Sequence, residues 1–213
     1  MTRILDRQRM LGPLLDRRYG METSTEVGVG PGYEAAKAQA QERATDPDCR
    51  PYTPVDWLML RRILARLEIS AEDVFVDFGS GKGRAVFLAA RYPFKRVIGV
   101  ELSPELHGIA QTNLRRNSHR LKCKDVQLVN SDVLDYAIPG DLTVAFLYNP
   151  FRGEIFNSWI DKLLRSVDER PRPVTLIYVN PFEEESLLAT KRARLISEEG
   201  RRGGQTAHVL HLA

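Results

Sequence analysis

The sequence predicts an α/β protein with a doubly wound, mostly parallel sheet of seven strands that ends in an antiparallel hairpin. From residue 52 onward, short runs rich in β-branched and aromatic residues alternate with helical stretches of about ten to fifteen residues. This alternation indicates βαβ units, and therefore a parallel sheet covered by helices on both faces. The last two runs, 192–199 and 207–213, have no helix between them, so they predict the terminal antiparallel pair.

Length and composition indicate one domain with an appendage. With 213 residues, 43% of them hydrophobic, the chain can bury one sizeable core. We expect residues 1–50 to form a partly helical N-terminal arm or lid, and residues 51–213 to form the domain. Within the arm, a helix is expected to end near Gly20, and a surface helix is expected over 33–44.

The same data bear on the compartment and on partners. No apolar run approaches the roughly 20 residues that cross a bilayer, and the start of the chain is charged, so we expect a cytoplasmic protein without a membrane partner. Cys49 and Cys123 lack the spacing of a zinc site or a disulfide framework, which predicts two reduced thiols and no metal. A net charge of +3, from 31 basic and 28 acidic residues, makes nucleic acid an unlikely partner. The oligomeric state is not indicated.

The elements of the domain follow in a regular order. Thr53 and Pro54 are suited to cap and begin a helix with one apolar face that extends to Leu67. The other expected helices are 83–92, 104–117, 153–167 and 182–189. The expected strands are 74–78, 96–102, 126–132, 142–150, 174–181, 192–199 and 207–213.

A glycine-rich loop follows the first strand in the stretch DVFVDFGSGKGRAVFLAA, with Gly79, Gly81 and Gly83 in five positions. A phosphate-binding P-loop is not indicated, because Val76 stands in place of its first glycine and Gly83 in place of its hydroxyl residue. A dinucleotide fingerprint is only weakly matched, because Arg84 occupies the position of its third glycine. Glycines in such a loop adopt positive φ values and let the backbone approach a ligand closely.

The acidic residues around this loop complete a pattern. Asp77 ends the first strand before the three glycines, and Glu101 ends the next strand. Over residues 52–182 this pattern resembles class I S-adenosylmethionine-dependent methyltransferases. The resemblance implies a Rossmann-like methyltransferase fold with S-adenosyl-L-methionine bound at the glycines. It also implies that Asp77 holds the amino end of the cofactor and Glu101 the ribose hydroxyls, while Asp132 and the Val133 amide meet the adenine.

Each of these acids also has a simpler interpretation. Asp77 could cap the turn that follows it, and Asp132 could be a turn residue in the polar sequence Asn-Ser-Asp. Glu101 could be a helix-entry residue, since Ser103 is a plausible N-cap and Pro104 a plausible first helical residue.

Two further pairs of residues flank the loop. Tyr52 and Thr53 loosely resemble a Tyr-x-Pro element that reaches the cofactor's carboxylate in some protein-methylating members of the superfamily; simple helix capping is the alternative. Lys82 and Arg84 are expected to be solvated or ion-paired residues at the start of a helix rather than ligands.

The expected acceptor side consists of two strand ends. Asn149, Pro150 and Phe151 resemble the [DN]-P-P-[FYW] motif of amino-group methyltransferases with one proline missing, and Asn149 is expected to contact the cofactor as well. The resemblance implies that the Asn oxygen accepts a hydrogen bond from the acceptor nitrogen while the aromatic ring stacks on it. Alternatively, Asn149 and Asn180 only end their strands, because a residue before proline is held extended.

Together these features predict an S-adenosylmethionine-dependent methyltransferase that acts on a nitrogen of a protein side chain or a small molecule. O-methylation of a small metabolite is the second possibility. An NAD(P)-dependent oxidoreductase and a non-catalytic RNA-binding module, which would use the basic run 115–124, are alternatives from other functional classes.

Overall fold

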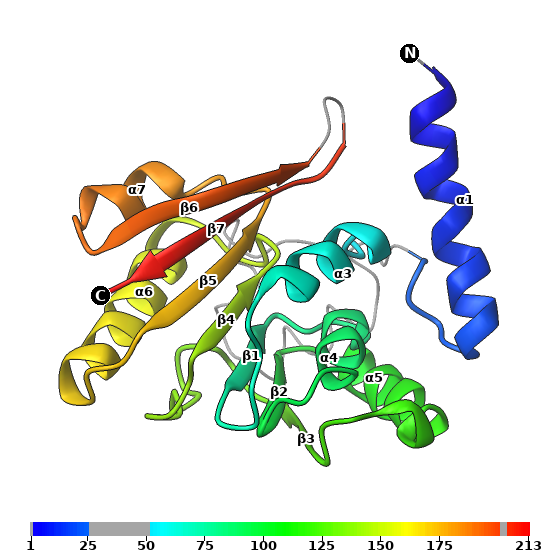
Figure 1. The fold of residues 1–213 in the computed structure, drawn as a ribbon, viewed down its shortest axis with the longest axis horizontal. Coiled ribbons are helices and arrows are strands. Elements are labelled where there is room, and N and C mark those ends of the chain that lie inside the picture. The colour runs from blue at the N-terminus through cyan, green and yellow to red at the C-terminus, as the bar shows by residue number, and fades with distance from the viewer. Residues whose placement is uncertain (1, 26–51, 201–203) are drawn as a thin grey trace.

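One seven-stranded sheet organises the fold, with strand order β3-β2-β1-β4-β5-β7-β6 (Figure 1). The computed structural model describes residues 2–25, 52–200 and 204–213. The first five strands in this order are parallel, while β7 runs antiparallel to both β5 and β6. The predicted fold class, including the terminal hairpin, is confirmed.

The elements alternate along the chain as expected. The strands are β1 Val74–Phe78, β2 Arg96–Glu101, β3 Asp125–Asn130, β4 Val144–Leu147, β5 Val174–Val179, β6 Ala193–Gly200 and β7 Thr206–Leu212. The helices are α1 Thr2–Tyr19, α3 Trp57–Arg66, α4 Arg84–Ala90, α5 Pro104–Arg116, the 3-10 helix η2 Ser118–Arg120, α6 Gly153–Glu169 and α7 Glu184–Ala189. The expected helix over 33–44 and Cys49 lie outside the described residues. No helix in the described ranges is long and apolar enough to span a membrane.

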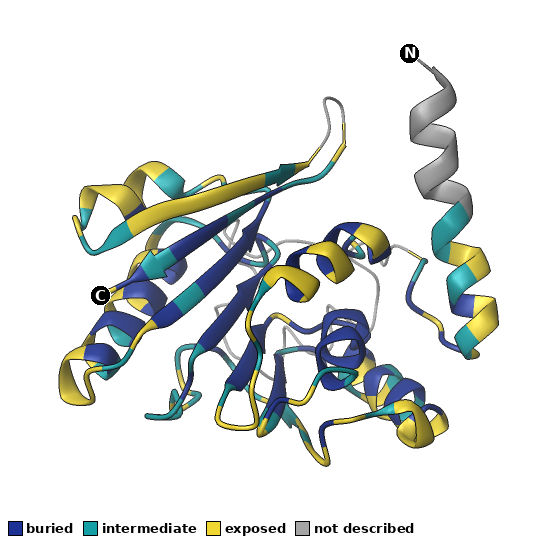
Figure 2. Cartoon of the chain, in the orientation of Figure 1, coloured by how far each residue is buried: buried dark blue, intermediate teal, exposed yellow. Residues whose placement is uncertain are grey.

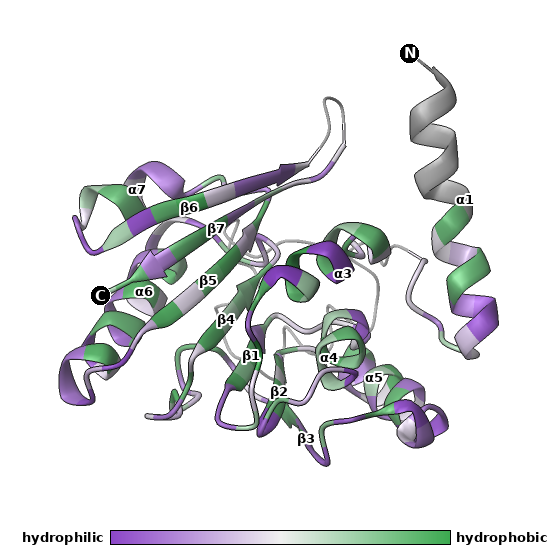
Figure 3. Ribbon diagram, in the orientation of Figure 1, coloured by the Kyte–Doolittle hydropathy of each residue, from purple (hydrophilic) through white to green (hydrophobic). Residues whose placement is uncertain are grey.

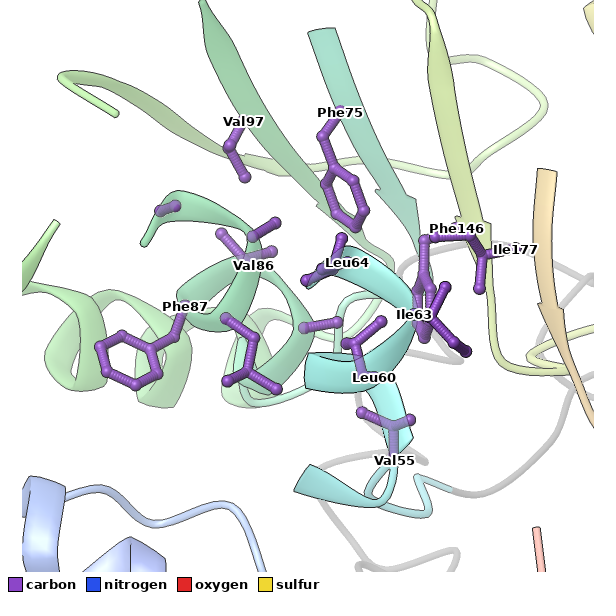
Figure 4. Close-up of a cluster of buried hydrophobic side chains, with 14 of the residues drawn as sticks. Val55, Leu60, Ile63, Leu64, Phe75, Val86, Phe87, Val97, Phe146 and Ile177 are labelled. Carbon is purple, nitrogen blue, oxygen red and sulfur yellow. The ribbon is translucent and has the colours of Figure 1, made fainter. Parts of the chain in front are cut away.

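The central strands β1, β2, β4 and β5 are buried on both faces, as their apolar sequences require, whereas the edge strands β3 and β6 are largely exposed or half-buried (Figures 2 and 3). Phe75, Phe146 and Ile177 contribute to the core on the face covered by α3 and α4 (Figure 4). Residues of the opposite pleat, such as Phe78, pack with Trp159 of α6 in the second core. Helix α4, which follows the glycine loop, is buried along its whole length (Figure 2).

Helix α5 begins as predicted, and α3 does not. The Ser103 side chain accepts a hydrogen bond from the Leu106 amide and caps α5. Helix α3 begins at Trp57 and is capped by Asp56, whose carboxylate accepts from the Met59 amide at 2.6 Å. Thr53 and Pro54 precede the helix, because hydrogen bonds to a distant residue hold the segment from Pro54 to Asp56 outside the helix.

The side chain of Gln205 holds this segment in an extended conformation. Its Nε2 donates to the Pro54 carbonyl at 2.9 Å, and its Oε1 accepts from the Asp56 amide at 2.7 Å. The partner is about 150 residues away along the chain, so local sequence could not indicate it. The prediction that Thr53 caps the helix and that Pro54 begins it is therefore wrong.

The two capping assignments predict different stabilities. Asp56→Ala should lower the free energy of unfolding by about 1 kcal/mol, because it leaves N-terminal amides of α3 without an acceptor. Thr53→Ala is the matched control and should change it by less than about 0.5 kcal/mol. Urea denaturation followed by circular dichroism measures both; equal destabilisation by the two substitutions would contradict the assignment of Asp56 as the cap.

Candidate active site

The glycine loop connects β1 to α4 at the carboxyl edge of the parallel strands. Gly79, Gly81 and Gly83 have φ values of +86°, +53° and +81°, in the left-handed region that favours glycine. A Cβ on Gly79 would lie 2.5 Å from Cβ of Pro150, and a Cβ on Gly81 would collide with the Tyr52 ring. The positive φ values are confirmed. The groups that approach the loop closely in this structure are side chains of the protein itself.

Hydrogen bonds fix the loop to the end of β2. The Gly79 and Ser80 amides both donate to the Val100 carbonyl at 2.9 Å. The Gly81 amide donates to Oε2 of Glu101 at 2.7 Å. The same carboxylate accepts from the Ser103 amide through Oε1 at 2.8 Å. Glu101 therefore joins the glycine loop to the start of α5. This confirms the interpretation of Glu101 as a helix-entry residue. A ligand would be a further partner for the carboxylate oxygens.

Two carboxylates are buried side by side at this strand edge. Asp77 is 2% exposed and Glu101 is 8% exposed. Burial raises the pKa of Asp77 well above its ordinary value, and the negative charge of Glu101 raises it further. Burial also raises the pKa of Glu101, although hydrogen bonds from backbone amides partly offset this. Among the described residues no hydrogen bond or ion pair reaches the Asp77 carboxylate, which leaves it free to bind a cationic group.

The two basic residues beside the loop glycines are paired with acids of the N-terminal segment. Lys82 is 1% exposed and pairs with Glu22 at 3.1 Å. Arg84 is 4% exposed and lies 3.6 Å from the carboxylate of Asp16. Of the two expectations, the ion-paired one is confirmed and the solvated one is wrong. With both cations engaged, the loop offers acids rather than cations to a ligand, which fits a phosphate-free cofactor that carries an ammonium group.

The residues expected around the rest of the cofactor have partners within the protein in this structure. Asp132 accepts from the Leu134 amide at 2.8 Å, as in the turn interpretation. The Val133 side chain is buried in the second core. The Tyr52 hydroxyl donates to the Thr23 carbonyl at 2.8 Å. Contacts of Tyr52, Thr53, Asp132 and Val133 with cofactor stay predictions.

The two Asn-Pro-Phe sequences differ in their hydrogen bonds. Asn149 and Asn180 have φ values of +43° and +48°, so the expectation of extended backbone before proline is wrong. Asparagine tolerates this left-handed conformation better than most residues. Asn180 accepts from the Thr206 amide at 3.1 Å and links β5 to β7, as the strand-ending interpretation implies. The side-chain oxygen of Asn149 is buried and has no hydrogen-bond partner in the described part of the chain.

The residues after Asn149 pack inward. Pro150 lies against Gly79, which places the end of β4 directly beside the glycine loop. Phe151 is 5% exposed, and its ring meets the edge of Trp159 with centroids 5.7 Å apart. In this structure the Phe151 ring is part of the core, so its stacking on an acceptor stays a prediction.

The glycine loop and the acids around it fall within one region of homology. The sequence matches the family described as "Histone methylation protein DOT1" over residues 51–177, more than half of the chain. The chain belongs to this family. The matched segment contains the glycine loop, Asp77, Glu101 and Asn149.

Individual proteins resemble the chain in part of its sequence or in its fold. A curated relative from Saccharolobus islandicus (strain REY15A), named protein-lysine N-methyltransferase, is 34% identical over 68 residues, which make up 32% of this chain and 42% of the relative. The match thus spans less than half of that relative. The structure of a SAM-dependent methyltransferase from Aquifex aeolicus superposes with a TM-score of 0.58 at 10% identity, covering 85% of this chain and 98% of the other. An RNA methyltransferase from Salinibacter ruber, in complex with S-adenosyl-L-homocysteine, gives 0.54 at 22% identity, with 75% and 94% covered.

The DOT1-family assignment confirms the predicted class I methyltransferase fold, S-adenosyl-L-methionine as cofactor, and the predicted class of enzyme. It favours these over an oxidoreductase or a non-catalytic RNA-binding module. The buried acids, the positive-φ glycines and the pairing of Lys82 and Arg84 with acids are compatible with that cofactor. The contacts of Asp77 and Glu101 with the cofactor stay predictions.

Glu101→Ala should weaken cofactor binding by about 2 kcal/mol, roughly thirtyfold, because charge-assisted hydrogen bonds to the ribose hydroxyls would be lost. Calorimetric titration with S-adenosyl-L-homocysteine measures this. Glu105→Ala, an exposed acid in the first turn of α5, is the matched control and should leave the dissociation constant unchanged. An unchanged constant for Glu101→Ala would contradict the assignment.

Asp77→Asn should have opposite effects on stability and binding. Because the folded-state pKa of Asp77 is raised, the ionised group opposes folding; the stability that Asp77 contributes is fully present below its unfolded-state pKa and is lost as pH rises through the raised folded-state pKa. Asp77→Asn should therefore exceed the wild type in stability at pH 7, by a margin that disappears near pH 4 or below. Its affinity for the cofactor should decrease.

Denaturant unfolding from pH 4 to 8 and calorimetry check these two effects, with the exposed α6 residue Asp161→Asn as control. A stability difference that does not vary with pH would contradict the argument.

Proposed function

We propose that this DOT1-family chain transfers a methyl group from S-adenosylmethionine to the ε-amino group of lysine in a protein substrate. Two findings support a protein acceptor over a small molecule. The family is described as one of histone methylation, and the Saccharolobus islandicus relative is named a protein-lysine N-methyltransferase. The proposal narrows the sequence-based expectation of a nitrogen on a protein or a metabolite.

The single observation that supports a nitrogen acceptor is the side-chain oxygen of Asn149, which has no hydrogen-bond partner among the residues that the structure describes. A buried acceptor without a hydrogen bond costs about 1–3 kcal/mol. The left-handed backbone of Asn149 adds strain of about the same size. Such costs are typical of functional sites, where a ligand supplies the missing partner. An amine can donate the N–H that this oxygen lacks.

The position of Asn149 suits methyl transfer. The sulfonium of the cofactor supplies an activated methyl group, so the protein has mainly to hold the acceptor in line with it. Pro150 packs against Gly79, so the preceding residue, Asn149, lies beside the glycine loop. An amine that donates one N–H to Oδ1 keeps its lone pair available for attack.

The acceptor amine must be neutral before it attacks. Phe151, two residues after Asn149, forms a buried aromatic pair with Trp159. Partial burial beside apolar rings lowers the pKa of a lysine amine by penalising its charged form. After the neutral amine has accepted the methyl group, the extra proton on the methylated nitrogen can leave to solvent. A strong general base is therefore not required for a nitrogen acceptor. An oxygen acceptor, the second possibility from the sequence, would need one.

Asn149→Ala should leave cofactor affinity unchanged within about twofold and reduce turnover by about ten- to a hundredfold, because it removes one hydrogen bond to the acceptor. Calorimetry and a methyl-transfer assay give the two quantities. Asn157→Ala, on the exposed face of α6, is the matched control. Wild-type turnover in Asn149→Ala would return this residue to a strand-ending role.

The acceptor class is tested by incubating the protein and S-adenosylmethionine carrying a labelled methyl group with lysate of the host cell. We expect label in proteins, at lysine side chains identified by mass spectrometry of peptides, and much less with Asn149→Ala. Label confined to small molecules or to nucleic acid would contradict the proposal. Label on protein hydroxyl groups would support oxygen transfer instead.

A further inference from the structure

The described part of the N-terminal arm is attached to the outer side of the glycine loop by a buried polar network. The Asp16 carboxylate, in the last turns of α1, accepts from the Thr23 amide at 2.6 Å, the Thr23 hydroxyl at 2.5 Å and the Ser24 amide at 2.6 Å. Asp16 is 7% exposed and Thr23 is fully buried. These bonds fold the chain after α1 into a tight hook, defined here as residues 16–24.

Arg84, the first residue of α4, binds this hook. Its Nε donates to the Thr23 hydroxyl at 2.8 Å and its Nη2 to the Ser24 hydroxyl at 2.9 Å. Its Nη1 donates to the Val55 carbonyl at 2.7 Å. A guanidinium buried this deeply is costly unless its N–H groups are satisfied, and the hook supplies two of the three acceptors.

The hook also holds the tyrosine that covers the glycine loop. The Thr23 carbonyl accepts from the Tyr52 hydroxyl at 2.8 Å, and the Tyr52 ring packs on Gly81. The amino group of Lys82 lies 5.7 Å from the centre of that ring and pairs with Glu22. Thr23 is thus bonded at once to the arm, to the first turn of α4 and to the cover of the loop.

We infer that Asp16, Thr23 and Arg84 are positioning residues that couple docking of the N-terminal hook to cofactor binding. The inference rests on the proposed place of the cofactor at the glycine loop and Tyr52. With the hook docked, Tyr52 is fixed over Gly81, and the charge of Arg84 at the start of α4 is neutralised by Asp16. With the hook released, the Tyr52 hydroxyl loses its acceptor and Arg84 loses two. Coupling of this kind is reciprocal, so the cofactor must stabilise the docked hook by as much as the hook strengthens cofactor binding.

The first experiment compares cofactor affinities. Asp16→Asn removes the charge but keeps the shape, and it should weaken S-adenosyl-L-homocysteine binding about tenfold, with a much smaller change in turnover at saturating cofactor. Thr23→Val, which removes the shared hydroxyl and keeps the carbonyl, should behave in the same way. Asp161→Asn is the control and should bind as the wild type does. Wild-type affinity in a folded Asp16→Asn or Thr23→Val would overturn the inference.

The second experiment needs only the wild type and remains decisive if both variants fail to fold. Hydrogen exchange by mass spectrometry reports the amides of Thr23 and Ser24, which donate to Asp16. Saturating S-adenosyl-L-homocysteine should slow their exchange about tenfold. Unchanged exchange in a protein that binds the compound would overturn the coupling and leave the proposed function intact. Failure of the wild type to bind the compound would instead refute the proposed cofactor site.

Discussion

The proposed site depends on the two hydrogen bonds that the Glu101 carboxylate accepts from backbone amides. One oxygen holds the Gly81 amide and the other holds the Ser103 amide, so a single side chain fixes the glycine loop against the first turn of α5. The burial that brings these amides together also raises the pKa of Glu101 and of its neighbour Asp77. The fold thus maintains two unfavourable buried acids at one strand edge. A ligand with an ammonium group and a diol would relieve that cost, whereas a phosphate would increase it.

The charges around the loop are separated by side. The acids Asp77 and Glu101 lie at the strand ends, while Lys82 and Arg84, only one and three residues beyond Gly81, are bound by the N-terminal hook. This separation explains why a loop with the sequence Gly-Lys-Gly-Arg need not bind phosphate. The hook contributes to the electrostatics of the site, because without the hook the buried cations Lys82 and Arg84 would lack their acidic partners.

The two Asn-Pro-Phe sequences show how identical local sequences acquire different roles. Both asparagines adopt left-handed backbone at the ends of adjacent parallel strands. Asn180 lies next to β7, so its oxygen meets the Thr206 amide and serves the sheet. Asn149 lies beside the glycine loop, where its oxygen finds no partner among the described residues. Position in the sheet, rather than residue type, decides which of the two oxygens has a partner among the described residues.

The sequence by itself determined the α/β class, the succession of strands and helices along the chain, the glycine loop and the acids that surround it. These features are local: apolar periodicity, turn chemistry and the cap at Ser103 depend on neighbouring residues. Only the tertiary structure decided the start of α3, the pairing of Lys82 and Arg84, and the different hydrogen bonding of Asn149 and Asn180. Each depends on a partner far away in sequence, such as Gln205 for Asp56 or Thr23 for Arg84, and such contacts leave no pattern in the local sequence.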